Sequence, residues 1–347
     1  MTTSEELLAA LQRLRLPETD QDPVALGWIK DAKVVGRVAA FTLALPPSRM
    51  AKRDDLERAV REGLRGLPGI DDLAIHVVAG AEQAAPQRGL ANVKHVIAIG
   101  SGKGGVGKST VSANLALALA KTGAKVGLLD ADIYGPSIPL LLGVADQKPL
   151  VQGNKLQPIE RLGLRMMSMG FLLPNADDPV VWRGPMLASA LRQFVQDVNW
   201  GELDYLLVDL PPGTGDVPLS LVQLLPLSGA IVVITPQAVA AAIGTKTLKM
   251  FQQTRVPILG IVENMSHFVC EHCGHDTPIF DTGGGKRASE ASGVPFLGEI
   301  PLDPKIRHTS DMGTPVVVAE PDSPPARAFV ALAEALREQV STAAGSH

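Results

Sequence analysis

The sequence predicts an α/β protein with a large domain, built on a doubly wound, mostly parallel sheet with helices on both faces, and a small α+β domain before it. From residue 93 onward, short runs that are apolar at every position alternate with helical stretches, which is typical of a parallel sheet buried on both sides. A glycine-rich loop joins the first of these runs directly to a helix. The segment 81–92 lacks hydrophobic periodicity, so we expect a small domain over 1–80 and a large domain over 93–347.

The small domain contains two helical and two strand-like segments. Residues 4–14 have apolar residues at helical spacing after an N-cap at Ser4, and residues 53–67 form a charged helix pattern that ends at glycine. Residues 37–45 and 73–78 are strand-like. These four segments predict a small α+β unit.

The large domain has a longer series of elements. Its expected strands are 95–100, 125–132, 205–213, 229–236, 258–265 and 294–300, and its expected helices are 110–123, 184–198, 238–254 and 323–340. Two further strand-like runs between residues 147 and 169 predict a hairpin that is inserted into this alternation. The last helix carries both signs of charge and lacks the lysine-rich face of a membrane-surface helix.

Composition and charge narrow the classes of function. The chain has 347 residues, 46% of them hydrophobic, and its formal net charge of -4 offers no basic surface for nucleic acid or an anionic membrane. It begins with an acidic segment and contains no run of about 20 apolar residues, so we expect a cytoplasmic protein without a signal peptide or a membrane span. Two cysteines are too few for a disulfide framework.

The glycine-rich loop satisfies the phosphate-binding pattern Gly-x-x-x-x-Gly-Lys-Ser, and it lies between a strand and a helix as its mechanism requires. Backbone N–H groups of such a loop face the β-phosphate, and the helix N-terminus adds partial positive charge. We expect Lys108 to bridge the β- and γ-phosphates, Ser109 to hold Mg²⁺ and Thr110 to reach the α-phosphate. The other loop residues expected to bind the nucleotide are Gly102, Gly104, Gly105, Val106 and Gly107.

Acidic residues at the ends of two predicted strands complete the expected phosphate site. Asp209 matches an acid that holds magnesium through water, and the glycine-rich segment 210–215 after it predicts a mobile loop near the γ-phosphate. Asp130 and Asp132 end another strand, where folds of this kind bind ligands. We expect Asp132 to polarise the attacking water and Asp130 to ligate or support Mg²⁺. Each acid taken alone is also compatible with a solvated strand end.

The two cysteines, Cys270 and Cys273, are spaced so that both thiolates can face one metal. A zinc or iron–sulfur centre needs four ligands, so one chain supplies half of a site. His267, His272 or His275 can complete it within the chain, or two chains can each contribute a cysteine pair on a two-fold axis. The spacing alone favours zinc, and a thioredoxin-like redox pair is a further alternative.

Five longer motifs resemble those of one family. The Mrp (ApbC) family of iron–sulfur cluster carrier ATPases has similar segments to GSGKGGVGKST, LLDADIYGPSIP, WRGPM, DYLLVDLPPGTGD and TPQ, over about residues 93 to 312. The family belongs to the P-loop NTPases with an extra loop lysine, together with MinD, ParA and the nitrogenase iron protein. The resemblance implies that ATP is the nucleotide and that Lys103 reaches the phosphates of a partner chain in a homodimer, as an arginine finger does. It also implies a [4Fe–4S] cluster that bridges Cys270 and Cys273 of the two chains.

The resemblance extends to three other segments. Asn264 ends a strand near the expected base pocket, where its amide can read the adenine edge. The segment Asp281–Gly293 resembles a glycine-rich segment of the family, with a phosphate or partner role or a plain helix start as equal alternatives. Residues 22–27 resemble a MIP18-like domain, but the chain lacks the cysteine common there, so we interpret the small domain as a docking module or a packing appendage.

These patterns together predict a slow ATPase, a homodimer that delivers an iron–sulfur cluster to recipient apoproteins. Its expected catalytic residues are Lys103, Lys108, Asp132 and Asp209, and hydrolysis should depend on positioning and charge. A MinD- or ParA-like positioning ATPase with a structural zinc site is the main alternative, but it needs a basic tail or surface that the chain lacks. A nitrogenase-type reductase is a third, but such proteins space their cluster cysteines far apart.

Overall fold

The computed structural model describes residues 3–14, 16, 22–24, 26, 28–79, 90–153, 155–172, 190, 193–270 and 272–344. They form two compact units that divide between residues 86 and 87. Within these ranges, no helix is both long and apolar enough to cross a bilayer. Most of the expected linker 81–92, the motif WRGPM at 182–186 and most of the expected helix 184–198 lie outside the described residues.

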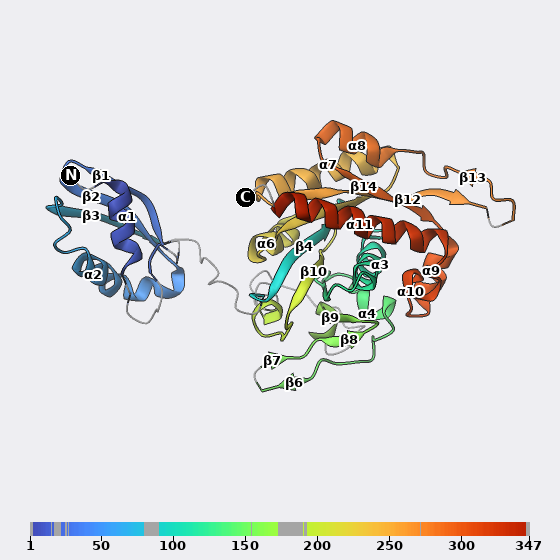
Figure 1. Ribbon diagram of the computed structural model, residues 1–347, viewed down its shortest axis with the longest axis horizontal. Coiled ribbons are helices and arrows are strands. Elements are labelled where there is room, and N and C mark those ends of the chain that lie inside the picture. Colours follow the sequence, from blue (N-terminus) through green and yellow to red (C-terminus); the bar gives the residue numbers. More distant parts are fainter. Residues whose placement is uncertain are drawn as a thin grey trace. The chain divides into compact units, whose positions relative to one another are not determined.

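The first unit is a three-stranded sheet with two α-helices, shown in blue in Figure 1. Its elements in chain order are α1 (Ser4–Gln12), β1 (Ile29–Val35), β2 (Val38–Leu45), η1 (Pro47–Lys52), α2 (Arg53–Gly63) and β3 (Asp72–Ala79). β2 pairs antiparallel with β1 and parallel with β3. Alternate residues of β2, among them Phe41 and Leu43, share one buried core with Leu7 of α1 and Leu56 of α2.

Two details of this unit differ from the sequence prediction. The sequence pattern does not predict β1, because Lys30, Asp31 and Lys33 interrupt its apolar run and a bulge lies between the two lysines. The N-cap of α1 is Thr3, so the expected cap at Ser4 is wrong. Thr3 Oγ1 accepts a hydrogen bond from the Glu6 backbone N at 3.2 Å and Glu6 Oε2 accepts one from the Thr3 N at 2.8 Å, a reciprocal pair that only Thr3 can form with a glutamate three residues later.

The second unit contains a mixed, mostly parallel sheet of nine strands (Figure 1). Its strand order is β13-β12-β11-β4-β10-β5-β9-β8, with β14 also on β12. The strands are β4 (Val93–Gly100), β5 (Val126–Asp130), β8 (Ile159–Arg161), β9 (Leu164–Ser168), β10 (Leu203–Asp209), β11 (Gly229–Ile234), β12 (Ile258–Val269), β13 (Asp276–Thr277) and β14 (Phe296–Leu302). Within the described part of this sheet only the pairs β8–β9 and β12–β13 are antiparallel, which confirms the predicted doubly wound sheet.

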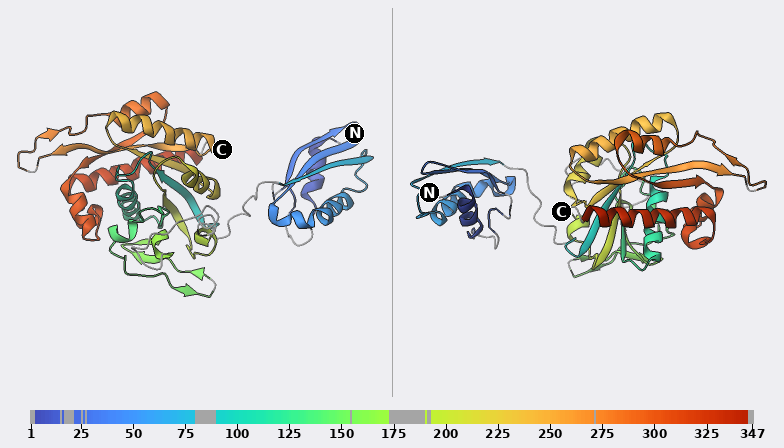
Figure 2. Two further views of the ribbon diagram at one scale, coloured as in Figure 1. Left: turned by 180° about the vertical axis from the view of Figure 1, so that it is seen from behind. Right: turned by 45° about the horizontal axis from the view of Figure 1, so that its top comes forward.

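Helices cover both faces of this sheet, as the views in Figure 1 and Figure 2 show. They are α3 (Lys108–Lys121), α4 (Ile138–Leu141), α6 (Asp216–Leu224), α7 (Ala238–Gln253), α8 (Gly284–Ser292), α9 (Pro304–Asp311), α10 (Val316–Ala319) and α11 (Pro324–Ala344), with the 3-10 helix η2 (Met169–Leu172). On β4, Ile97 and Ile99 join the core formed with α3 and α11, whereas Val96 and Ala98 join the core formed with α6 and α7. This alternation explains why the strand is apolar at successive positions.

The hairpin predicted between residues 147 and 169 is only partly right. β8 and β9 do form a hairpin, but β9 also pairs parallel with β5, so it continues the main sheet and is not an insertion. The upstream run instead belongs to a separate two-stranded ribbon of β6 (Val151–Gln152) and β7 (Lys155–Leu156).

Candidate functional site

The glycine-rich loop lies between β4 and α3, at the carboxyl edge of the sheet. Gly105 and Gly107 have φ values of +79° and +76°, a left-handed conformation that favours glycine, and Gly107 is the N-cap of α3. The loop borders a cavity of about 220 Å³, which residues 103–110 line together with Asp132. Of the loop residues predicted to bind nucleotide, only Gly102 is not part of the lining. The loop therefore lies between a strand and a helix, as the sequence predicts, while the roles of its residues stay predictions.

Lys108 is the first residue of α3 and its side chain is almost fully buried. Its Nζ lies 2.8 Å from Asp209 Oδ2 and 3.6 Å from Asp132 Oδ2. The structure thus brings the loop lysine and two of the predicted acids together in one ion-pair cluster. The cluster holds the ammonium at the wall of the cavity.

Asp209 is fully buried at the end of β10 and accepts two hydroxyl hydrogen bonds in addition to the ion pair with Lys108. Ser109 Oγ donates to its Oδ2 and Ser112 Oγ to its Oδ1, each at 2.6 Å. Carboxylate and hydroxyl oxygens are hard donors of the kind that Mg²⁺ prefers, so Ser109 and Asp209 fit a magnesium ion. Ser112 was not predicted; its spacing of four residues after Lys108, on the same helix face, was the available signal.

The two acids after β5 have different surroundings. Asp130 is fully buried, and its carboxylate accepts hydrogen bonds from Ser168 Oγ at 2.9 Å and from the backbone N of Asp132 and Ile138. Burial, and then the charge of Asp209, raise the pKa of Asp130 to about 8. These contacts occupy both oxygens of the Asp130 carboxylate and favour the supporting role over direct ligation of Mg²⁺.

Asp132 faces the cavity and is the acid predicted to polarise water. Its Oδ1 accepts from the backbone N of Tyr134 and Gly135, which fixes the carboxylate at the cavity wall. Burial raises the pKa of Asp132, whereas the neighbouring Lys108 lowers it. A carboxylate whose proton affinity is raised is a better proton acceptor near neutral pH.

The extra loop lysine, Lys103, is hydrogen bonded within its own chain. Its Nζ donates to Gln237 Oε1 at 3.0 Å, and Gln237 is the N-cap residue of α7. Gln237 belongs to the TPQ motif, but the sequence alone gave no reason to pair it with a residue so far away. The contact keeps Lys103 at the edge of the cavity that it lines.

Asn264 lies against the back of the glycine-rich loop. Its Nδ2 donates to the Val106 carbonyl at 2.8 Å, and a Cβ on Gly107 would lie 2.3 Å from the same nitrogen. The amide donor expected to read adenine is thus bound to a loop carbonyl in this structure. Adenine recognition by Asn264 stays a prediction.

The cysteine pair lies in the turn between β12 and β13. The backbone N of Cys270 donates to His275 O at 3.0 Å and that of Gly274 donates to Cys270 O at 2.8 Å. Cys270 is half-buried and Cys273 is exposed. No cluster of three or more His, Cys, Asp or Glu side chains that could hold a metal occurs in the part of the chain that the structure describes, so it shows no third ligand beside the pair.

The glycine-rich segment Asp281–Gly293 contains the start of α8, which Glu263 caps. The carboxylate of Glu263 is buried and accepts a hydrogen bond from the backbone N of Gly285. A buried carboxylate at the helix N-terminus occupies the position that an anionic ligand would take. This contact favours the plain helix start over a phosphate site.

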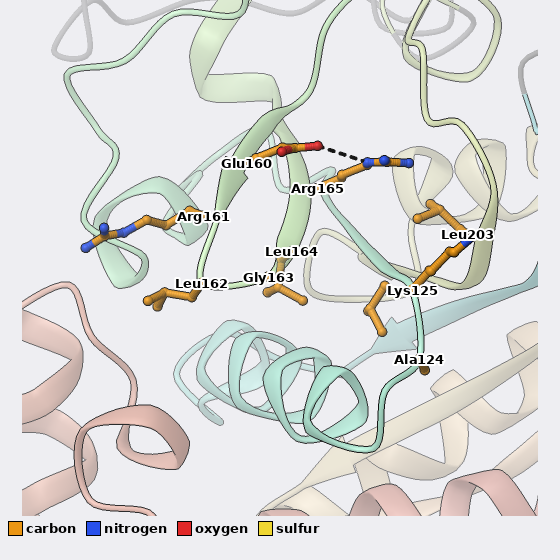
Figure 3. Close-up of a pocket in the computed structure, with 10 residues that line it drawn as sticks. Ala124, Lys125, Glu160, Arg161, Leu162, Gly163, Leu164, Arg165 and Leu203 are labelled. Carbon is orange, nitrogen blue, oxygen red and sulfur yellow. Dashed lines mark hydrogen bonds and ion pairs between the residues drawn. The ribbon is translucent and has the colours of Figure 1, made fainter.

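A larger cavity, of about 350 Å³, lies at the opposite, amino edge of the same sheet. Figure 3 shows Arg161 pointing away from the β8–β9 turn and an ion pair between Glu160 and Arg165. Arg165 also donates to Trp200 O, and Lys125 pairs with Glu202 outside the lining. Lys125 and Arg165 are thus already paired with glutamates, and Arg161 donates to the Leu142 carbonyl. Because the glycine-rich loop lies at the other edge, this cavity is not the candidate nucleotide site.

Comparison with known proteins gives consistent matches over both units. A profile of NUBPL iron-transfer P-loop NTPases matches residues 92–337, and a profile described as iron–sulfur cluster assembly protein matches residues 4–77. The chain is 45% identical over 352 residues to an iron–sulfur cluster carrier protein of Synechocystis, which covers 99% of each protein. It is 46% identical over 319 residues to the one of Escherichia coli K12, covering 91% of this chain and 84% of the relative.

Solved structures show the same fold. A nucleotide-binding protein from Archaeoglobus fulgidus, in complex with ADP, is 45% identical with a TM-score of 0.59 and covers 65% of this chain and 89% of its own. The cell division ATPase MinD of Pyrococcus furiosus is 25% identical with a TM-score of 0.53, covering 71% and 99%. These matches confirm the P-loop NTPase fold and the resemblance to the Mrp (ApbC) family. The chain belongs to the iron–sulfur cluster carrier family of P-loop NTPases.

Proposed function

We propose that this chain is an ATP-binding and ATP-hydrolysing homodimer that carries a [4Fe–4S] cluster on Cys270 and Cys273 of both copies and delivers it to apoproteins. The observation that carries the proposal is the presence of two features in one unit: a phosphate-binding loop with a buried ion-pair cluster, and a turn that presents two cysteines. Family membership supports the iron–sulfur assignment over zinc.

In the proposed reaction, the loop N–H groups and Lys108 bind the phosphates of ATP. Ser109 and Asp209 would hold Mg²⁺, which when bound neutralises developing charge on the phosphates. Asp132 orients and polarises the attacking water from the cavity wall. Lys103 exchanges its contact with Gln237 for the phosphates of the partner chain, where its charge stabilises the transition state.

The cargo would be held by thiolate ligands at the β12–β13 turn. Transfer is then a ligand exchange, in which each iron–sulfur bond to a cysteine breaks as one to a thiolate of the recipient forms, and no electron changes hands. The exposure of Cys273 gives a recipient direct access to the turn.

We also propose the domain division 1–80, 81–92 and 93–347, with the small domain as a docking module for recipients, and a cytoplasmic location. The match of the small domain to an iron–sulfur cluster assembly profile supports a role in the same process.

Anaerobic reconstitution with iron and sulfide tests the proposal, followed by analysis of iron, zinc and sulfide and of the mass in solution. We expect about four irons and four sulfides per pair of chains in the wild type, and none in Cys270→Ala/Cys273→Ala. His272→Ala/His275→Ala, which changes two exposed side chains of the same turn, is the matched control and should load fully. Bound zinc without sulfide would contradict the carrier assignment and would indicate a structural zinc site at the cysteine pair.

A further inference from the structure

One strand, β12, contacts the phosphate-binding loop and also carries the cysteine turn. Asn264, in the middle of the strand, touches the loop, and Cys270 follows the last residue of the strand, Val269. The two sites of the proposed function are therefore joined by one short stretch of backbone.

The contact at the loop is tight. Asn264 is 6% exposed and its Nδ2 donates to Val106 O at 2.8 Å. A Cβ at position 107 would lie 2.3 Å from the same nitrogen, so only glycine fits there. Val106 and Gly107 also line the cavity. A movement of the loop around a bound phosphate must therefore displace the Asn264 amide or break its hydrogen bond.

A strained bulge follows immediately after this contact. Met265 has a φ of +59°, which is rare for a residue with a side chain. Asn264 pairs with Ile300 of β14 and the next paired residue, Phe268, pairs with Leu302. β12 therefore advances by four residues where β14 advances by two, which defines the bulge. Strained backbone of this kind persists only where the surroundings fix it, and it is common in switch regions.

Beyond the bulge, β12 forms a short hairpin with β13 whose turn contains the cysteines. Phe268 and Val269 pair with Thr277 and Asp276 of β13, and the backbone of Cys270 is hydrogen bonded within the turn. A change of path at the bulge is therefore passed on to the hairpin that carries both cysteines. Figure 1 shows this hairpin reaching beyond the other strands of the sheet.

We propose that Asn264 is a positioning residue that transmits occupancy of the phosphate-binding loop, through the bulge at Met265, to Cys270 and Cys273. The inference rests on the proposed function, because it takes nucleotide as the ligand of the loop and the cysteines as the metal site. It adds a route by which ATP controls the presentation of the thiols within one chain.

Thiol labelling tests this route without iron. The chain has two cysteines, so the rate of modification by a chromogenic disulfide reagent reports on the turn alone. Rates are compared without nucleotide and with saturating Mg-ADP or Mg-ATP, at a protein concentration where sedimentation shows single chains. Nucleotide binding is measured separately by calorimetry, and folding by circular dichroism.

The variants Asn264→Ala and Asn264→Asp both remove the donor to Val106, the second with almost no change of volume. Asn199→Ala is the matched control, because Asn199 Nδ2 donates to Gln157 Oε1 at an exposed site. Met265→Gly relieves the positive φ but keeps the Asn264 contact.

In the wild type and in Asn199→Ala we expect nucleotide to change the labelling rate by about fivefold or more, the lower end of typical coupling between sites. In both Asn264 variants the change should fall below about twofold at nucleotide concentrations that calorimetry shows to saturate each variant. Met265→Gly should reduce the response as well, because a glycine lets the bulge change its path without moving the hairpin. A wild-type response in Asn264→Ala or in Met265→Gly, or no response in wild type that binds nucleotide, would each overturn the route from the loop to the cysteines. Asn264 variants that cannot be saturated at any nucleotide concentration would make Asn264 a binding residue and would also overturn the positioning role. Wild type that binds no nucleotide would instead remove the proposed function, and this inference with it.

Discussion

The ion pair between Lys108 and Asp209 should contribute more to the free energy of unfolding, measured without nucleotide, than a surface pair of the same length. Its atoms lie 2.8 Å apart with side chains 5% and 0% exposed, which corresponds to about 6 kcal/mol of attraction at an effective dielectric constant near 20. Removing one partner of a buried pair typically costs about 3 to 5 kcal/mol. We expect about 3 kcal/mol for Asp209→Asn, because Asp132 still faces the ammonium at 3.6 Å.

The reverse change, Lys108→Met, should destabilise by about 2 to 3 kcal/mol, because two serine hydroxyls continue to donate to Asp209. The double variant should cost about as much as one single change, which gives a coupling energy of about 2 to 3 kcal/mol. The pair Arg307–Asp311 is the control: it is 2.7 Å long but its side chains are 74% and 60% exposed, so its coupling should stay below about 0.5 kcal/mol.

Equilibrium urea unfolding without nucleotide or magnesium measures these values. The background Trp28→Phe/Trp182→Phe leaves Trp200 as the fluorescent reporter, and this residue is buried in the core of the second unit. If the losses in unfolding free energy of the two single variants add up to that of the double variant within about 0.5 kcal/mol, Lys108 and Asp209 are not energetically coupled and the reasoning from burial is refuted.

Three further predictions concern single positions. Gln237→Ala should release Lys103 and raise the rate of ATP hydrolysis by about twofold to fivefold. Gln237→Glu should bind Lys103 more tightly, because it adds a negative charge, and lower that rate. Equal rates for the two variants in a steady-state phosphate assay would contradict this prediction. The folded pKa of Asp130, about 8, lies above its unfolded value of 3.8, so the folded state holds a proton that the unfolded state releases and stability falls as pH rises through this range. Asp130→Asn should flatten that decline in urea midpoints, and an unchanged slope would remove Asp130 as its source. Gly107→Ala adds a Cβ at φ +76° against Asn264 and should lower the free energy of unfolding by at least about 1 to 2 kcal/mol in the same urea assay. It should also weaken ATP binding in calorimetry. Wild-type values in both assays would contradict the close approach of Gly107 and Asn264.

The sequence was sufficient where chemistry depends on residues close together in the chain. The glycine spacing, the lysine and the serine define the phosphate-binding loop locally, and its flanking strand and helix follow from apolar runs. The contacts Lys103–Gln237 and Asn264–Val106 join residues more than a hundred positions apart, and sequence spacing carries no information on them. β1 was missed for a different reason, since a bulge and three charged residues remove its alternation.

The direction of the strands explains how one contact can serve both proposed sites. β4 ends at Gly100 and β10 at Asp209, so the loop and its acids lie at the carboxyl edge of the sheet. β12 is parallel to β11, with which its pairing stops at Glu263, and it then continues to Val269 beyond that edge. The cysteines therefore leave the sheet on the side that holds the loop. In the proposed homodimer, a second copy that faced this edge would meet both the loop and the cysteines. Under the proposed function, a single two-fold interface would bring Lys103 to the partner's phosphates and gather four thiolates, so nucleotide and cluster would each favour the dimer that the other requires.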